Sequence, residues 1–380
     1  MKSHDRATVL AAVQEFGHAL KYASKKLRDD REVVLAAVQR HGLALKYASK
    51  QLRGDRDIVL AAVQQNACAL WHASKKFRDD RHVVLAAVQQ WGGAFACASK
   101  KLRADREFTL AAVRMRGRAL EYAAKTLRGD REVVLAAVTQ FGQGLMWVSD
   151  TLCGDREVVL AAVTNEGLSL QFASEALRGD RDLVLIAVKN IGRALEFAAE
   201  TLRDDREIVI TAVANMEFDF FGNTFKHASA RLRDDHQTVL AAATSGNGFY
   251  LLHASPKLRA DREIVLAAVK NKCNHALRYA SENLRADREL ILVAVQHNGF
   301  LLEHASATLR ADPDIVLAAV NECRKAFRYA RGDITLGAGA KRYRRAGPVE
   351  TRLLFKYMPY PFELPEAVVR ECILPRCHRS

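Results

Sequence analysis

The chain has 380 residues, of which 49% are hydrophobic and 27% charged. This composition is typical of an ordinary folded protein and excludes collagen-like, mucin-like and wholly disordered classes. The 58 Lys and Arg against 44 Asp and Glu give a net charge of +14. No uninterrupted apolar run approaches the roughly 18–20 residues that span a bilayer, and the polar first residues predict no secretory signal.

The pattern of cysteines indicates the redox state of the cellular compartment and whether a zinc site is expected. Seven cysteines are scattered along the chain without a CxxC pair, which predicts reduced thiols in an intracellular protein and neither a disulfide framework nor a zinc site. We expect the cytoplasm, and a basic cluster near the C-terminus leaves the nucleus open as an alternative.

A repeat with a period of 25 residues begins at the first Asp-Arg pair. Ala stands seven residues after each repeating Asp, and Leu stands five residues after it, with Ile210 as the exception. The repeating Asp occupies these positions: Asp5, Asp30, Asp55, Asp80, Asp105, Asp130, Asp155, Asp180, Asp205, Asp235, Asp261, Asp287 and Asp312. Thirteen such repeats over residues 1–331 predict an all-α solenoid.

Each repeat is predicted to hold two short helices. The repeating Asp is placed to cap the first helix, and Pro313 after Asp312 suits a first helical position. A glycine twelve residues after the Asp, as at Gly42, predicts a left-handed C-cap. The second helix is predicted over residues such as 44–52, with one apolar face and lysines opposite. Two helices of about eleven residues are marginal alone, so stacking of neighbouring repeats must supply the core.

The pattern D-x-x-x-V-L-A-A-V-x-x-x-G-x-x-L-x-Y-A-S-x-x-L resembles the tandem repeat family called domain of unknown function 4116. The resemblance covers about 330 of the 380 residues. It implies α-helical tandem repeats, and because the family has no established activity it brings no functional residues to this chain.

Two segments depart from the repeat. The ninth repeat is stretched at 215–223 and carries Phe218, Phe220 and Phe221, which predicts either a longer loop tucked into a groove or an exposed docking loop. Residues 332–380 form a basic tail that holds five of the seven prolines and the cluster Lys341, Arg342, Arg344 and Arg345. We expect a partly extended tail whose apolar stretches cap the last repeat, and the cluster is a candidate nuclear-import patch.

Three columns of side chains recur once per repeat. Arg stands two residues before most of the Asp residues and again directly after them. These columns suit either phosphate contacts or, as we favour, Arg–Asp ladders between repeats. An aromatic or His column, including Tyr22, Tyr47 and Trp147, suits either base stacking or, as we favour, packing between repeats. The single histidines of that column have no HxxxH partner, so no metal site is predicted.

The residue before each glycine is the one that changes in every repeat. Phe16, His41, Trp91, Arg116 and Phe141 hold this position in five of the repeats. It is either an unconstrained surface site or a contact rim, because repeat proteins place contacts at loop ends.

The charge of the second halves also changes along the array, with lysines in repeats 1–4 and acidic residues in repeats 6–8. This gradient suits either solvation or the orientation of a partner.

These patterns favour binding over catalysis. The sequence contains none of the nucleotide-binding, hydrolase or metalloprotease motifs, so no enzyme and no cofactor is predicted. The first hypothesis is a scaffold that binds protein partners, and the alternative is a nucleic-acid-binding repeat array with one variable position per repeat.

Overall fold

The computed structural model describes residues 5–215, 223–245, 249–271 and 275–331, with the backbone of residues 334–335 and 342–343. The chain divides into two compact bodies, Met1–Tyr279 and Ala280–Ser380, and each is described by itself. Repeats are numbered here from 1 to 13, each starting at its repeating Asp, and the contact between consecutive repeats is called a seam.

Each repeat opens with an α-helix of eight to ten residues that starts directly after the Asp. In repeat 2 the carboxylate of Asp30 accepts hydrogen bonds from the backbone N–H groups of Glu32 and Val33, at 3.0 and 3.1 Å, which confirms the predicted cap. The opening helices are α1 (Arg6–Glu15), α2 (Arg31–Arg40), α3 (Arg56–Gln65), α4 (Arg81–Gln90), α6 (Arg106–Met115), α7 (Arg131–Val138), α8 (Arg156–Asn165), α10 (Arg181–Asn190), α11 (Arg206–Ala214), α14 (His236–Ser245), α16 (Arg262–Lys270), α19 (Arg288–His297) and α20 (Pro313–Glu322).

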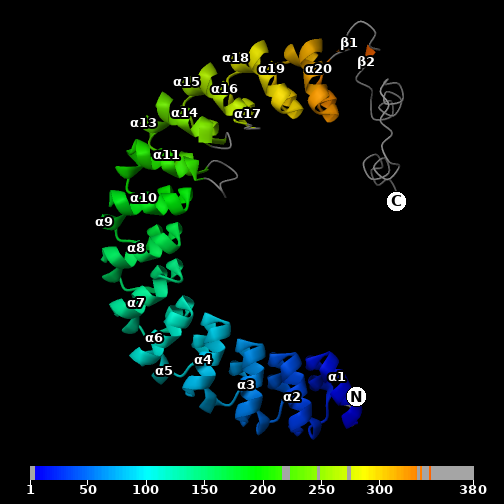
Figure 1. The fold of residues 1–380 in the computed structure, drawn as a ribbon, viewed down its shortest axis with the longest axis vertical. Helices are drawn as coiled ribbons and strands as arrows, with labels where there is room; N and C mark the ends of the chain where they lie inside the picture. Colours follow the sequence, from blue (N-terminus) through cyan, green and yellow to red (C-terminus); the bar gives the residue numbers. More distant parts are fainter. Residues whose placement is uncertain are drawn as a thin grey trace. The chain divides into compact units, whose positions relative to one another are not determined.

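These helices supply the core. Val33, Val34, Ala37 and Val38 of α2 are fully buried, and the equivalent positions are buried in most other repeats. Within the first body each opening helix lies beside the next (Figure 1). The fold is therefore the predicted all-α repeat solenoid, in which burial between neighbours replaces a central core.

The second half of each repeat differs from the prediction of one α-helix. It consists of two short segments with a break between them. The first segments are η1 (Gly17–Tyr22), η3 (Gly42–Tyr47), η5 (Ala67–Trp71), η7 (Gly92–Cys97), η8 (Gly117–Tyr122), η10 (Gly142–Trp147), η12 (Gly167–Phe172), η13 (Gly192–Phe197), η15 (Phe249–Leu252), η16 (Gly299–His304) and η18 (Arg324–Tyr329), which are 3₁₀ helices, and the short α-helices α12 (Asn223–Lys226) and α17 (Ala276–Tyr279).

The second segments close each repeat. They are the 3₁₀ helices η2 (Leu27–Asp29), η4 (Leu52–Gly54), η6 (Lys75–Arg78), η9 (Leu127–Gly129), η11 (Leu152–Gly154), η14 (Leu202–Asp204) and η17 (Leu309–Ala311), and the short α-helices α5 (Lys100–Ala104), α9 (Glu175–Arg178), α13 (Ala230–Arg233), α15 (Pro256–Arg259) and α18 (Glu282–Arg285).

The break between the two segments has a physical cause in the seam. In repeat 2, Ala48 is extended (φ −64°, ψ 158°), and the N–H of Ser49 donates to the carbonyl of Arg28 in repeat 1 at 2.8 Å. A continuous helix would direct that N–H to its own preceding turn. The same seam bond, at 2.6–3.1 Å, joins Ser74 to Arg53, Ser99 to Arg78, Ala124 to Arg103, Ser149 to Arg128, Ser174 to Cys153, Ala199 to Arg178, Ser229 to Arg203, Ser255 to Arg233, Ser306 to Arg285 and Arg331 to Arg310.

The repeating glycine also differs from its prediction. No described glycine has a φ in the left-handed region, and the residue before it ends the helix in an extended conformation, as at His41 (φ −152°). A Cβ on Gly42 would lie closer than 3.0 Å to the Ala62 carbonyl oxygen of the next repeat, and the same holds at Gly17, Gly117, Gly142, Gly167, Gly192 and Gly299. The glycine is therefore needed for close approach of two repeats.

Repeat 13 departs from the others at the positions that face a following repeat. Pro313 stands where most repeats have the Arg after the Asp, and Arg324 stands where most have the glycine. Leu317 of α20 is 41% exposed, whereas its counterparts in the earlier repeats are mostly half-buried. The last described repeat thus carries a terminal face of its own.

Several sequence expectations fall outside the described residues. They include Phe218, Phe220 and Phe221 of the stretched ninth repeat, and Lys341, Arg344 and Arg345 of the basic cluster. In the tail the backbone of β1 (Ile334–Thr335) pairs antiparallel with β2 (Arg342–Tyr343), with Ile334 opposite Tyr343. Over the described ranges no helix combines the length and the apolar character needed to cross a bilayer.

Two glycines of repeat 2 test the close-approach argument. Gly42→Ala places a methyl group against the Ala62 carbonyl, and we expect a loss of about 1–3 kcal/mol in unfolding free energy. Gly54 has nothing within 4 Å of an added Cβ, so Gly54→Ala is expected to be neutral or stabilising by up to about 1 kcal/mol. Urea denaturation measures both, and equal effects at the two sites would contradict this account.

Candidate functional site

The variable position of each repeat lies where the opening helix ends. Trp91 illustrates its backbone, which is extended (φ −152°, ψ 119°) while its N–H donates to the Ala87 carbonyl at 3.1 Å. Trp91 thus contributes only its backbone to this helix end, whereas the Asn66 side chain also caps the next segment by accepting from the N–H of Cys68 at 2.9 Å. We call the residues at this position the rim, defined by Phe16, His41, Asn66, Trp91, Arg116, Phe141, Glu166 and Ile191.

Three rim residues are exposed. Phe16 is 66% exposed and Trp91 is 42% exposed. The Trp91 ring lies over the backbone of Gly93, where a Cβ would meet the ring atoms closer than 3.0 Å. Arg116 is exposed, and its Nε donates to the Gln89 carbonyl of the preceding repeat at 3.1 Å. These side chains offer apolar surface on repeats 1 and 4 and cationic surface on repeat 5.

Two other predicted rim residues are half-buried. The ring of His41 stacks on His18 of the preceding repeat, with centroids 3.9 Å apart. Burial, with a smaller effect from His18, lowers the pKa of His41. Phe141 stacks on Trp147 at 5.8 Å within its own repeat. The predicted rim is therefore exposed at Phe16, Trp91 and Arg116 and half-buried at its other positions.

The Arg that follows the Asp forms the predicted ladder between repeats. Arg106 pairs through Nε with Asp130 and through Nη2 with Glu132, both at 2.7 Å. The same register joins Arg6 to Asp30, Arg31 to Asp55, Arg56 to Asp80, Arg81 to Asp105, Arg131 to Asp155, Arg156 to Asp180, Arg181 to Asp205, Arg206 to Asp235 and Arg288 to Asp312. These guanidinium groups are engaged within the array, which counts against phosphate binding by this column.

The Arg column that precedes the Asp is half-buried beside the aromatic column. Arg103 donates from Nη1 to the Tyr122 carbonyl of the next repeat at 3.4 Å. Arg78 lies over the Trp71 ring at 5.2 Å. Burial lowers the pKa of His72, helped by the charges of Lys46 and Arg53. Most described aromatic side chains of the column are likewise half-buried, which agrees with packing between repeats.

The predicted charge gradient is present on the surface. The nine lysines of repeats 1–4 are exposed, namely Lys21, Lys25, Lys26, Lys46, Lys50, Lys75, Lys76, Lys100 and Lys101. Asp150, Glu175 and Glu200 of the middle repeats are exposed as well. In the basic part, Lys46 lies over the ring of Tyr47 at 4.9 Å. Cationic and aromatic groups therefore share the second halves of the first repeats.

The described cysteines are free thiols. They are Cys68, Cys97, Cys153 and Cys323. Burial raises the pKa of Cys97 to about 12, so at neutral pH this side chain is a protonated thiol that is not poised as a nucleophile.

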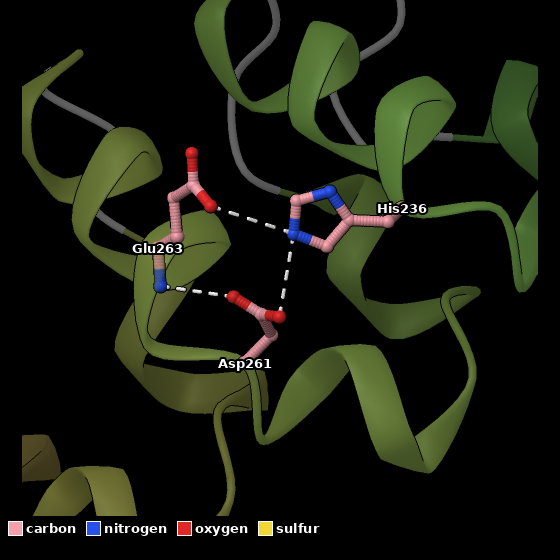
Figure 2. A group of neighbouring side chains, drawn as sticks. All are labelled: His236, Asp261 and Glu263. Atoms are coloured by element: carbon pink, nitrogen blue, oxygen red, sulfur yellow. Dashed lines mark hydrogen bonds and ion pairs between the residues drawn. The ribbon is translucent and has the colours of Figure 1, made fainter.

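One position of the Arg–Asp ladder was not predicted from the sequence. We call each pairing of this ladder between two repeats a rung. His236 replaces the Arg after the Asp in repeat 10, and it faces Asp261 and Glu263 of repeat 11 (Figure 2). Among the described residues this is the group whose side chains can converge on a metal ion. Spacing within one repeat could not reveal it, because its members are 25 and 27 residues apart. The available signal was His236 itself, a break in the Arg column.

Comparison with known families accounts for the array. The family model Domain of unknown function (DUF4116) matches the chain seven times in tandem, at residues 5–53, 30–78, 80–128, 130–178, 180–216, 243–285 and 287–334. The chain belongs to this family. Most of the matches span two of the 25-residue repeats, and the family's description assigns no function. A search of curated proteins finds no match.

The cap carboxylates predict how stability depends on pH. The hydrogen bond from Arg131 lowers the pKa of Asp155, and that from Arg106 lowers the pKa of Asp130. A carboxyl whose pKa is lower in the folded state stabilises that state above its unfolded value of about 3.9. This stabilisation disappears as the pH falls through the lowered folded pKa, so the urea midpoint is expected to drop between about pH 5 and pH 2.

A pair of variants separates the ladder from general acid effects. Asp155→Asn keeps a residue that caps helices well but lacks the ion pair, so its urea midpoint should fall less steeply on acidification. The exposed Asp150 lies five residues earlier, and Asp150→Asn should retain the full dependence. A wild-type midpoint that stays level or rises toward pH 2 would refute the assignment.

Proposed function

We propose that this chain is a non-enzymatic helical-repeat scaffold that binds protein partners along its rim. The observation that carries the proposal is the exposure of Phe16 and Trp91 at a position where the seams fix the backbone and leave the side chain free. Aromatic side chains are enriched at protein interfaces, where they supply large buried area. A rim with one different side chain per repeat can present a distinct surface to each segment of a partner.

The chemistry of the other columns supports binding rather than catalysis. The carboxylates that cap the opening helices accept hydrogen bonds from backbone N–H groups and pair with Arg. Their structural role therefore accounts for their presence in every repeat. Cys97 is buried and protonated at neutral pH. The free thiols of the described cysteines support the expected intracellular location.

Rim substitutions test this function. We expect Phe16→Ala and Trp91→Ala to reduce the recovery of partners in affinity purification with mass spectrometry, because each removes an exposed aromatic anchor. Met146→Ala is the matched control, since Met146 is exposed but lies outside the rim. Recovery of the same partners by all three variants would remove the rim from the proposal.

A nucleic-acid-binding array is the second candidate. The observation that favours it is the set of exposed lysines beside aromatic rings in repeats 1–4. Proteins that bind single-stranded nucleic acids combine basic and aromatic side chains in this way. The engagement of the Arg ladder with carboxylates weighs against it.

A gel shift decides this second candidate. If it holds, single-stranded DNA or RNA is retarded at about 50 mM salt, and the affinity falls steeply as salt is raised. Lys46→Gln with Lys50→Gln should then weaken binding, whereas Glu175→Gln with Glu200→Gln should not. Absence of a shift at low salt excludes this function.

A further inference from the structure

The seam between repeats 10 and 11 holds a different set of groups from its neighbours. Elsewhere in the ladder a permanently charged guanidinium pairs with the cap Asp, and in several repeats it also pairs with the residue two positions later, as Arg106 does with Asp130 and Glu132. In repeat 10 an imidazole takes that place, while both carboxylates of repeat 11 are retained as Asp261 and Glu263. The two carboxylates therefore face an imidazole, which is charged only when it is protonated, instead of a guanidinium, which is always charged.

The distances at this position are longer than those of most Arg pairs in the ladder, with Arg31–Asp55 at 3.8 Å as an exception. Nε2 of His236 lies 3.3 Å from Oδ2 of Asp261 and 3.6 Å from Oε2 of Glu263. Both are longer than the roughly 2.7–2.9 Å of a charge-assisted hydrogen bond. Ligands about 2.0–2.1 Å from a tetrahedral zinc ion are about 3.3–3.4 Å apart. The two distances from Nε2 are therefore compatible with a shared ion, and the ligand atoms of the three side chains all lie within 4.8 Å of one another.

The ligand groups are also held in place. Oδ1 of Asp261 accepts from the backbone N–H groups of Glu263 and Ile264 at 2.9 and 3.2 Å, which leaves Oδ2 directed at the imidazole (Figure 2). His236 is the first residue of α14, and the cap of that helix, Asp235, accepts from the N–H of Thr238 at 2.9 Å. Hydrogen bonds that orient ligating carboxylates strengthen metal sites.

We propose that His236, Asp261 and Glu263 form a binding site for a divalent transition-metal ion of the zinc class, shared between repeats 10 and 11. One imidazole nitrogen and two carboxylate oxygens are ligands that zinc accepts, whereas calcium and magnesium prefer oxygen ligands alone. The three side chains are 42%, 30% and 69% exposed, so water has access to complete the coordination. The ion would join two repeats at the point where other seams use Arg.

The array offers a control that keeps the seam intact. His236→Arg restores the residue found in eleven of the other repeats, and its guanidinium can pair with the same two carboxylates. It therefore removes the nitrogen ligand without leaving the carboxylates unpaired. Glu263→Gln is a second variant, because it removes one oxygen ligand from an exposed position and leaves the cap of α16 in place.

The test is zinc titration of the full-length chain, stripped with a chelator and reduced, at pH 7.5. We expect one saturable site by isothermal titration calorimetry that is absent in His236→Arg and at least tenfold weaker in Glu263→Gln. Zinc should also raise the melting temperature of the wild type and leave that of His236→Arg unchanged. Cobalt bound at the site should show no thiolate charge-transfer band, since no cysteine takes part.

Three outcomes would overturn the proposal. Zinc binding of equal strength in wild type and His236→Arg would place the ion elsewhere, for instance on cysteines. Absence of any saturable binding would show that the rung holds no metal. Stabilisation of the wild type by acidification to pH 6, with no effect of zinc at pH 7.5, would show that the rung is closed by a proton only.

Discussion

The seam is the contact on which the whole array depends. Among the described residues, eleven repeats donate a backbone N–H to a carbonyl of the repeat before them, as Ser49 does to Arg28. At the other end of the same repeat, Gly42 lies so close to the Ala62 carbonyl that a side chain has no room. Because both contacts involve backbone atoms, they fix the spacing of consecutive repeats independently of most side chains. Burial of the Val and Ala positions then stabilises the spacing that the backbone has set.

This division of labour explains why some columns vary and others do not. The rim residue contributes only backbone to the end of the opening helix, so its side chain can be Phe, His, Trp or Arg without change to the fold. The ladder Arg and the cap Asp pair with each other across the seam, so a change of either side chain alters a contact between two repeats. The variable surface and the fixed framework are therefore consequences of the same geometry, and this is the physical basis for the proposal that partners bind along the rim.

Much of the fold was accessible from the sequence, and the errors share one origin. The period, the opening helices, the Asp caps and the Arg–Asp ladder depend on local patterns and on simple repetition, and all were predicted. The second α-helix was wrong because Ala48 and Ser49 leave the helix to bind the preceding repeat. The left-handed glycine was wrong because Gly42 is constrained by Ala62 of another repeat. His236 was overlooked since its partners lie one repeat away. Simple repetition predicts a contact made by two fixed columns, as in the Arg–Asp ladder. Rules of local conformation do not anticipate a backbone contact between repeats, or the partners of a single substituted residue.

The terminal face of repeat 13 has a consequence for self-assembly. A tandem array made of equivalent seams is at risk of continuing between molecules, because the first repeat of one copy could dock on the last repeat of another and start a fibre. Repeat 13 differs at two positions that most seams use, since Arg324 replaces the glycine and Pro313 replaces the Arg. Without the glycine and the guanidinium, this face lacks two contacts that most of the described seams share, which makes it a poorer surface for a second copy to extend the stack.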